Sequence, residues 1–301
     1  MSRLRSRKVF LLGLFVILFT IVAVKWRSFD EKTESSRKYV GFRMNTGRFG
    51  AQLFHLIAGY GIGRTLNRTH YLSLQDGPIV HVVKYLRQFK EVFPRLQETF
   101  VIAPYDADET RVAFSTACCK FDNPLRLYNN TSKYLFLMLK FGQHPKYFQD
   151  YIEDIRKFLQ FSENVKQMGE KNFTAAWKTF NRDSMCIHTR RSDFVQLKVS
   201  TDMENAVKAA TSIAQQKEAN TVRKTVYVSN FSVPVDLYAA SQLCTSFLIT
   251  ATTSTFGWWL AFFSKNQHNV FYMSDKRNLY DKVPRRELFL ERWKDFSNQT
   301  S

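Results

Sequence analysis

The chain has 301 residues, enough for one large domain or two of ordinary size. Hydrophobic residues make up 45% and aromatic residues 15% of the sequence, which is ample for a large core and excludes a wholly disordered chain. The formal net charge is +18, but the basic residues are spread along the chain, without zinc-ligand spacing or an RNA-binding aromatic motif. This distribution argues against nucleic-acid binding and suits a protein that binds a nucleotide diphosphate or lies beside anionic lipid.

The first predicted element is a transmembrane signal anchor at residues 9–24. This uncharged run (VFLLGLFVILFTIVAV) follows a basic tail, residues 1–8, and precedes Lys25, Trp26 and Arg27. A run of this length can span a thinner membrane when Lys and Arg snorkel and Trp lies in the interface. The more basic flank stays in the cytoplasm, so the rest of the chain is expected in the lumen. A cleaved signal peptide is the alternative, but the small residues of a cleavage site are missing after Val24.

Residues 25–38 are mostly polar and are predicted to form a short stem. Sequons agree with a lumenal chain, and the candidate N-glycosylation sites are Asn67, Asn129, Asn130, Asn172 and Asn298. The cysteines are even in number, which permits disulfides in an oxidising lumen: Cys118, Cys119, Cys186 and Cys244. Their pairing cannot be read from the sequence.

Residues 39–180 are predicted to form an N-terminal α/β domain. After a Gly-rich turn, residues 51–66 have the pattern of an amphipathic helix, and residues 70–74 have that of a strand. This strand, turn, helix, strand order is typical of an α/β unit. Residues 79–160 mix helical patterns with short strands, such as one at residues 98–103.

Residues 181–301 are predicted to form a C-terminal Rossmann-like domain that binds the nucleotide ligand. Strands are expected at residues 184–188, 225–229, 246–250 and 269–273, and helices at residues 201–218, 235–244 and 256–264. Their alternation predicts a parallel, doubly wound sheet with ligands at the carboxyl ends of the strands. The fold class is therefore α/β, with two Rossmann-like domains divided near residues 174–183.

The motif HTRRSD at residues 188–193 stands where a predicted buried strand ends. Arg190 and Arg191 stay charged and can form bidentate, charge-assisted hydrogen bonds with phosphate oxygens. When a diphosphate is the leaving group, positive charge beside it stabilises the transition state more than the ground state. Asp193 can orient a guanidinium or accept a proton. The alternative reading is an exposed Arg–Asp pair at a strand end, which contributes little.

Two further segments have the composition of anion sites. Residues 250–257 (TATTSTFG) place hydroxyls and free N–H groups before a predicted helix, although plain capping by Ser254 or Thr255 accounts for them equally. Residues 47–54 (GRFGAQLF) place glycines before another predicted helix, where Arg48 can reach a phosphate. A bare Gly-x-x-Gly turn is a weak signal.

A metal site is the less favoured alternative. Asp106 and Asp108 flank one residue, as in metal-dependent sugar transferases, but acidic loops of this kind are usually solvated. The histidines outside the motif lack ligand spacing and are expected to be structural: His55, His70, His81, His144 and His268. Trp258 and Trp259 are expected to pack in the core.

Taken in order, three segments resemble the alpha-1,2-fucosyltransferases of glycosyltransferase family 11. Residues 47–54 are similar to that family's Gly-Arg-x-Gly-Asn-Gln-x-Phe, and residues 188–193 to its His-x-Arg-Arg-x-Asp. Residues 236–244 (DLYAASQLC) and 254–259 (STFGWW) look like its C-terminal block. The clear match covers about residues 41–74 and 184–274.

The resemblance implies a type B-like, two-domain enzyme in the Golgi membrane. It would transfer L-fucose from GDP-fucose to a terminal galactose of glycans, with inversion and without a metal or other cofactor. The resemblance implies catalytic roles for Arg190, Arg191 and Asp193. It implies donor binding by His188, Arg48, Gly50, Gln52, Ser254, Thr255, Phe256 and Gly257.

Two departures favour the alternative of an inactive glycan- or nucleotide-binding relative. The family's Asn is replaced by Ala51, which cannot offer amide hydrogen bonds. The stretch between residues 218 and 225 is shorter than the family pattern leads us to expect. The acceptor glycan, the linkage, the general base and the oligomeric state are not readable from the sequence; Asp193 is the candidate base.

Overall fold

The computed structural model describes residues 36–177, 184–215, 228–279 and 281–296. The predicted tail and anchor and most of the predicted stem lie outside these residues. Among the described helices, none is long and apolar enough to cross a membrane. Lys38–Ser301 forms one compact unit, in which two parallel sheets are built in succession along the chain. The boundary between the two predicted domains stays a prediction.

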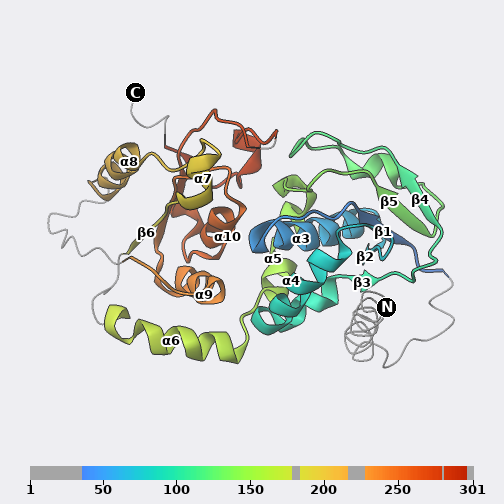
Figure 1. Cartoon of the computed structure of the whole chain (residues 1–301), viewed down its shortest axis with the longest axis horizontal. Coiled ribbons are helices and arrows are strands. Elements are labelled where there is room, and N and C mark those ends of the chain that lie inside the picture. Colours follow the sequence, from blue (N-terminus) through green and yellow to red (C-terminus); the bar gives the residue numbers. More distant parts are fainter. Residues whose placement is uncertain (1–35, 178–183, 216–227, 280, 297–301) are drawn as a thin grey trace, which may run out of the picture. The chain divides into compact units, whose positions relative to one another are not determined.

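The first sheet has the strand order β3-β2-β1-β5-β4, with neighbouring strands parallel (Figure 1). Its strands are β1 (Tyr39–Phe42), β2 (Thr69–Leu72), β3 (Val101–Ile102), β4 (Glu109–Val112) and β5 (Tyr134–Leu137). Its helices are α3 (Phe49–Thr65), α4 (Ile79–Val92) and α5 (Ile152–Phe158). The central strand β1 is buried throughout, as expected of a parallel strand that is covered on both faces.

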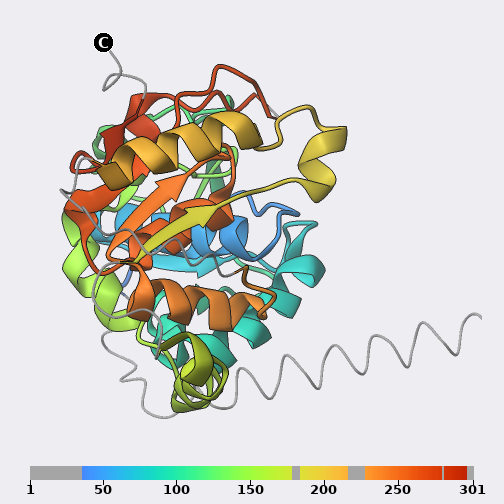
Figure 2. The same ribbon diagram turned by 90° about the vertical axis from the view of Figure 1, so that its left-hand side faces the viewer.

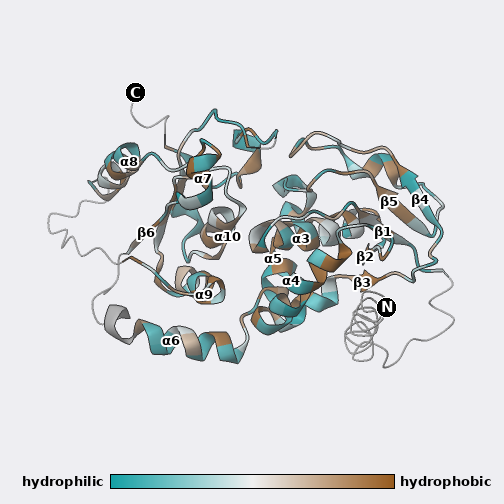
Figure 3. Ribbon diagram, in the orientation of Figure 1, coloured by the Kyte–Doolittle hydropathy of each residue, from teal (hydrophilic) through white to brown (hydrophobic). Residues whose placement is uncertain are grey.

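The helices of this half differ in how much of their surface is buried. α3 is buried on nearly every side and contacts β1, β2 and α10. α4 has both hydrophobic and hydrophilic residues along its ribbon (Figure 3), and it buries residues spaced three or four apart. α3 is therefore a central element of the core, whereas α4 covers it from outside.

The second sheet has the order β6-β7-β8-β9, again parallel. Its strands are β6 (Met185–His188), β7 (Ser246–Ile249), β8 (Val270–Tyr272) and β9 (Lys294–Asp295). The helices around it are α6 (Glu163–Trp177), α7 (Ser192–Gln196), α8 (Met203–Gln215), α9 (Val233–Leu243) and α10 (Thr255–Phe263).

Helices cover both faces of the second sheet. Ala209 and Ile213 of α8 pack with Leu248 on one face, whereas α9 packs with the neighbouring positions Phe247 and Ile249 on the other. Figure 2 shows α8 and α9 on opposite sides of the strands. This doubly wound arrangement confirms the predicted parallel α/β organisation and fits a Rossmann-like glycosyltransferase.

Several predicted elements differ from the structure. The strand expected at residues 98–103 is reduced to Val101–Ile102, because Pro94–Thr99 forms a 3₁₀ helix that begins with proline. The sequence patterns do not locate the strands β4, β5 and β9. Of the strand expected at residues 225–229, residues 225–227 lie outside the described chain, and Val228 and Ser229 are not in a strand.

The cysteines pair as two disulfides. Cys186 of β6 bonds to Cys244, which directly precedes β7, with 5.4 Å between their Cα atoms. Cys118 bonds to its neighbour Cys119. The first bond joins β6 to the residue before β7, so it links the two ends of the connection between these strands.

Three buried histidines make stability sensitive to acid. Burial lowers the pKa of His55 to about 3 and that of His144 to about 4, and burial with the nearby charge of Arg190 lowers the pKa of His188 to about 4. Below pH 6.5, the ordinary pKa of histidine, the unfolded chain therefore binds protons that the folded chain does not bind.

We therefore expect the melting temperature to fall as the pH is lowered from about 6.5 toward 4. Each histidine lowers the free energy of unfolding by up to about 1.4 kcal/mol for each pH unit in this range. Thermal melts across this range measure the slope. His55→Leu should make the slope shallower, whereas His268→Gln, at an exposed position, serves as the control. A slope that His55→Leu leaves unchanged would contradict this account.

Candidate functional site

Arg190 and Asp193 lie just beyond the carboxyl end of β6. Arg190 Nη2 lies 2.9 Å from Asp193 Oδ1, and the guanidinium lies 5.3 Å from the centre of the Phe194 ring. Asp193 also accepts a hydrogen bond from Arg48, which belongs to the loop before α3. One carboxylate therefore orients two arginines from distant parts of the sequence.

The charge state of Asp193 follows from these partners. Partial burial raises its pKa, but hydrogen bonds from Arg190 and Ser192 and the charge of Arg48 outweigh burial and leave the pKa below its ordinary value. Asp193 is thus an ionised partner of the arginines. A carboxylate with a lowered pKa and two cationic neighbours is a poor general base.

Gln52 shapes the loop that carries Arg48. Its Nε2 donates to Asn45 O at 2.7 Å and to Gly47 O at 3.0 Å, and the side chain is buried. Ala51 is also buried, and a Cβ added at Gly47 would lie 2.5 Å from the Cβ of Ala51. Gln52 therefore supports the loop through its hydrogen bonds. Ala51 packs closely against Gly47, and its side chain has no polar atom.

The N-terminus of α10 packs directly on both motif segments. A Cβ added at Gly50 would lie 2.8 Å from Phe256 N and 2.9 Å from Thr255 Oγ1, and one added at Gly257 would lie 2.6 Å from His188 Nδ1. Only glycine allows these approaches without displacement of the α10 backbone beside Gly50 or of the buried His188 ring beside Gly257. Ser254 caps the helix by accepting from Gly257 N at 3.3 Å, so the capping alternative is correct for Ser254.

These contacts bring together the three segments that the sequence singled out. The start of α3, the end of β6 and the start of α10 meet at the carboxyl edge of the second sheet. Arg191 lies beside them at the residue before α7, with an exposed side chain. In doubly wound folds this edge is where ligands bind.

Buried polar atoms gather at the same edge. Among the described residues, the buried side-chain atoms there without a hydrogen-bond partner are His188 Nδ1, Arg190 Nε, Thr252 Oγ1, Thr253 Oγ1 and Tyr272 OH. Tyr272 ends β8, and the two threonines lie between β7 and α10. Buried polar groups seldom lack a partner, so this concentration marks a candidate site for a polar ligand.

The sequence by itself does not single out Thr252, Thr253 or Tyr272. The signal that could have found them is their position, since each follows or ends a parallel strand of the second sheet. Thr252 and Thr253 lie inside the segment 250–257, in which the sequence does not distinguish one hydroxyl from another. Tyr272 looks like an ordinary aromatic residue of a buried strand.

The remaining predicted residues lie elsewhere. In the part of the chain that the structure describes, no group of three His, Cys, Asp or Glu side chains could hold a metal ion. Trp258 and Trp259 are buried, as predicted. Among the sequon residues, Asn67, Asn129 and Asn172 are exposed, Asn130 is partly buried, and Asn298 lies outside the described chain.

Comparison with known proteins tests the resemblance that the motifs predict. No protein-family model matches the chain. The Caenorhabditis elegans protein named "Putative glycosyltransferase C06E1.7" is 29% identical, over 85% of this chain and 80% of the relative. A Caenorhabditis elegans galactoside 2-alpha-L-fucosyltransferase is 28% identical, over 90% of this chain and 87% of the relative. The chain is thus similar to fucosyltransferase enzymes over most of its length, which confirms the resemblance that its motifs predict and the expectation of an enzyme.

Proposed function

We propose that the chain transfers L-fucose from GDP-fucose to a terminal galactose of a glycan, as an inverting alpha-1,2-fucosyltransferase that needs no metal. The observation that carries the proposal is the pairing of Arg190 and Arg48 on one carboxylate, beside the N-terminus of α10 and the buried hydroxyls of Thr252 and Thr253. Cations, a helix N-terminus and hydroxyl donors together suit a diphosphate.

In the proposed step a galactose hydroxyl attacks the anomeric carbon of fucose from the face opposite the diphosphate. The new carbon–oxygen bond forms as the bond to the β-phosphate oxygen breaks, and the hydroxyl proton passes to a base. GDP leaves with the bonding electrons. Arg190 then stabilises negative charge that grows in the transition state, which accelerates the reaction more than ground-state binding would.

Asp193 acts in this proposal by orienting Arg190 and Arg48 before the donor binds. Its carboxylate occupies one edge of each guanidinium, while Arg190 Nε, buried and without a hydrogen-bond partner, remains able to donate. Because the arginines are already aligned, less conformational freedom is lost when the diphosphate binds. In this proposal Asp193 is therefore not the proton acceptor.

The test measures donor binding and transfer with the full chain in detergent. GDP should raise the melting temperature in the presence of EDTA, and labelled fucose should pass from GDP-fucose to a galactose-terminated acceptor under the same conditions. Asp106→Ala is the control for a metal at the acidic loop and should leave both results unchanged. Activity that EDTA removes and a divalent ion restores would refute metal independence.

The alternative is an inactive relative that binds a glycan or nucleotide. It is favoured by Ala51, which stands where the family pattern has Asn and contacts Gly47. Stabilisation by GDP with no transfer to any galactose-terminated acceptor would support this alternative. Ala51→Asn is then the informative variant, although a longer side chain beside Gly47 must displace the loop.

We propose further that the protein is a single-pass type II protein of the Golgi membrane with its folded unit in the lumen. The support is the uncharged run at residues 9–24, its basic flank and the exposed sequons at Asn67, Asn129 and Asn172. Protein from eukaryotic cells should migrate faster on a gel after enzymatic deglycosylation. Unchanged mobility would count against a lumenal location.

A further inference from the structure

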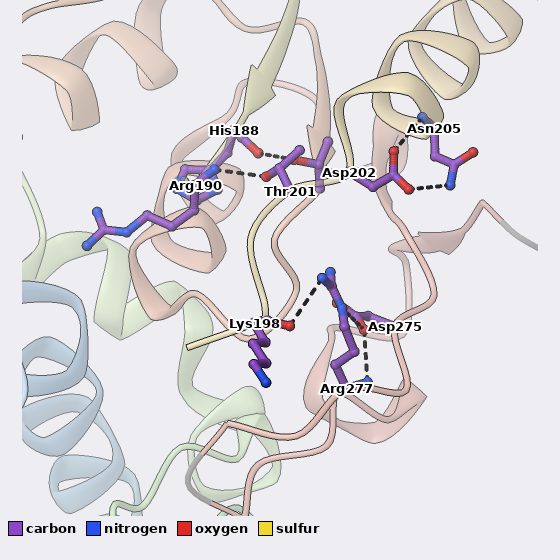
Figure 4. Close-up of polar contacts among 9 residues, drawn as sticks. His188, Arg190, Lys198, Thr201, Asp202, Asn205, Asp275 and Arg277 are labelled. Atoms are coloured by element: carbon purple, nitrogen blue, oxygen red, sulfur yellow. Dashed lines mark hydrogen bonds and ion pairs between the residues drawn. The ribbon is translucent and has the colours of Figure 1, made fainter. Parts of the chain in front are cut away.

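A line of buried hydroxyls connects the backbone of Arg190 to the neighbouring strand. Arg190 N donates to Thr201 Oγ1 at 2.9 Å, Thr201 Oγ1 lies 2.9 Å from Thr250 Oγ1, and Thr250 Oγ1 donates to His188 O at 2.7 Å. Figure 4 shows the hydrogen bond from Arg190 to Thr201, with His188 beside them. Thr201 and Thr250 are 2% and 3% exposed, so water does not compete for these bonds.

The direction of each hydrogen bond follows from proton counting. A threonine hydroxyl has one proton to donate. Thr250 gives its proton to the carbonyl of His188, so Thr201 must donate to Thr250, and the oxygen of Thr201 remains to accept from Arg190 N. The bonds therefore run in one direction from Arg190 to His188. A side chain without a hydroxyl at either threonine breaks the line.

Thr201 also closes the loop that carries Asp193. Thr201 N donates to Arg190 O at 2.9 Å, so both backbone polar groups of Arg190 are bonded to this one residue. The loop between them packs Phe194 and Val199 against Ala251. The backbone N–H and C=O of Arg190 are thus both hydrogen-bonded to Thr201, and Thr201 is in turn bonded to Thr250.

We infer that Thr201 and Thr250 are positioning residues for Arg190 in the proposed transfer. They touch neither the donor nor the acceptor and act through the backbone of the arginine. The inference rests on the proposed function, because it assigns Thr201 and Thr250 to the same diphosphate site. It predicts that catalysis depends on two hydroxyls 49 residues apart in the sequence.

The experiment compares Thr201→Val, Thr201→Ser, Thr250→Val and Arg190→Ala. The matched control is Thr99→Val, because Thr99 is 2% exposed and its hydroxyl donates to Leu96 O at 2.7 Å, within a 3₁₀ helix of the first half. Thr201→Val should lower kcat by about a hundredfold, since a displaced catalytic group costs about that much. Thr201→Ser should stay within about threefold of wild type, because serine keeps the hydroxyl.

A purely structural role would lower the melting temperature of Thr201→Val and Thr99→Val alike and leave kcat of the folded enzyme unchanged. Thr201→Val with kcat within about threefold of wild type, or a serine variant as impaired as the valine variant, overturns the inference. If Thr201→Val does not fold, Thr250→Val decides: lowered kcat supports the inference and wild-type kcat overturns it.

The arginine variant separates this inference from the proposed function. Wild-type turnover in Arg190→Ala overturns both, whereas lost turnover there with normal Thr201→Val overturns the hydroxyl line alone. A wild-type chain that binds GDP without transferring fucose refutes the transferase. The inference is then judged on GDP affinity, which Thr201→Val should lower by about tenfold and Thr99→Val should leave unchanged.

Discussion

Arg190→Ala is expected to lower kcat by about a hundredfold to a thousandfold, which corresponds to about 2.7–4 kcal/mol of transition-state stabilisation. The guanidinium is oriented by Asp193 and Phe194, its side chain is 23% exposed, and its Nε is buried without a hydrogen-bond partner. A donor diphosphate would provide that partner. Arg190→Lys keeps the charge but loses the planar fork, so it should already be severely impaired.

The fold should survive the removal of this side chain. Asp193 keeps Arg48 as an ion-pair partner, and its own side chain is 37% exposed, so the remaining carboxylate is still solvated. Turnover and melting temperature are measured together for wild type and the two variants. Arg95→Ala, which removes an exposed arginine paired with Glu98, is the matched control. Near-wild-type turnover in Arg190→Ala would refute the donor-site assignment, and lost turnover with an equally lost melting transition would show a structural role only.

Trp259→Ala is expected to reduce the free energy of unfolding by about 3–5 kcal/mol, the usual cost of truncating a buried Trp. Trp259 is fully buried and packs against Phe54 and Trp258, with ring centres 4.9 Å apart in both pairs. Its Nε1 donates to Gly50 O at 3.0 Å. The side chain therefore joins α10 to the glycine segment that carries Arg48.

The milder variant Trp259→Phe separates the hydrogen bond from the packing. Phe fills much of the space but cannot donate to the carbonyl of Gly50, and the loss of this hydrogen bond should cost about 0.5–1.5 kcal/mol. Denaturant unfolding measures both variants, and His268→Gln is the exposed control. Loss of less than about 1 kcal/mol in Trp259→Ala would contradict the tight packing of α10 on α3.

The order of elements in the C-terminal half could be predicted because its strands and helices have strong local signals. β7 and β8 are buried and mostly apolar, and α10 directly follows Ser254, which caps it. For most ends of these strands and helices, the observed bound lies within two residues of the predicted one. Hydrophobic periodicity and helix capping depend on residues that are close together in the sequence, so both can be predicted from it.

The first half was less predictable because its short strands have weak local patterns. β4 (ETRV) has two exposed and two partly buried residues, and its position as a strand follows from pairing with β5. A strand of this kind is stable only when its neighbour is already in place, since its own residues bury little apolar area. β9, with two residues, is a similar case.

The sequence by itself determined the three motifs, their order, the parallel α/β organisation of the second half and the resemblance to fucosyltransferases. Only the tertiary structure showed that Arg48 and Arg190 share Asp193, that Cys186 pairs with Cys244, and that Thr201 bonds to Arg190 and Thr250. The physical reason is the same for each contact. Each contact joins groups that lie apart in the sequence. It forms only when whole helices and strands pack together, and no local sequence pattern encodes that packing.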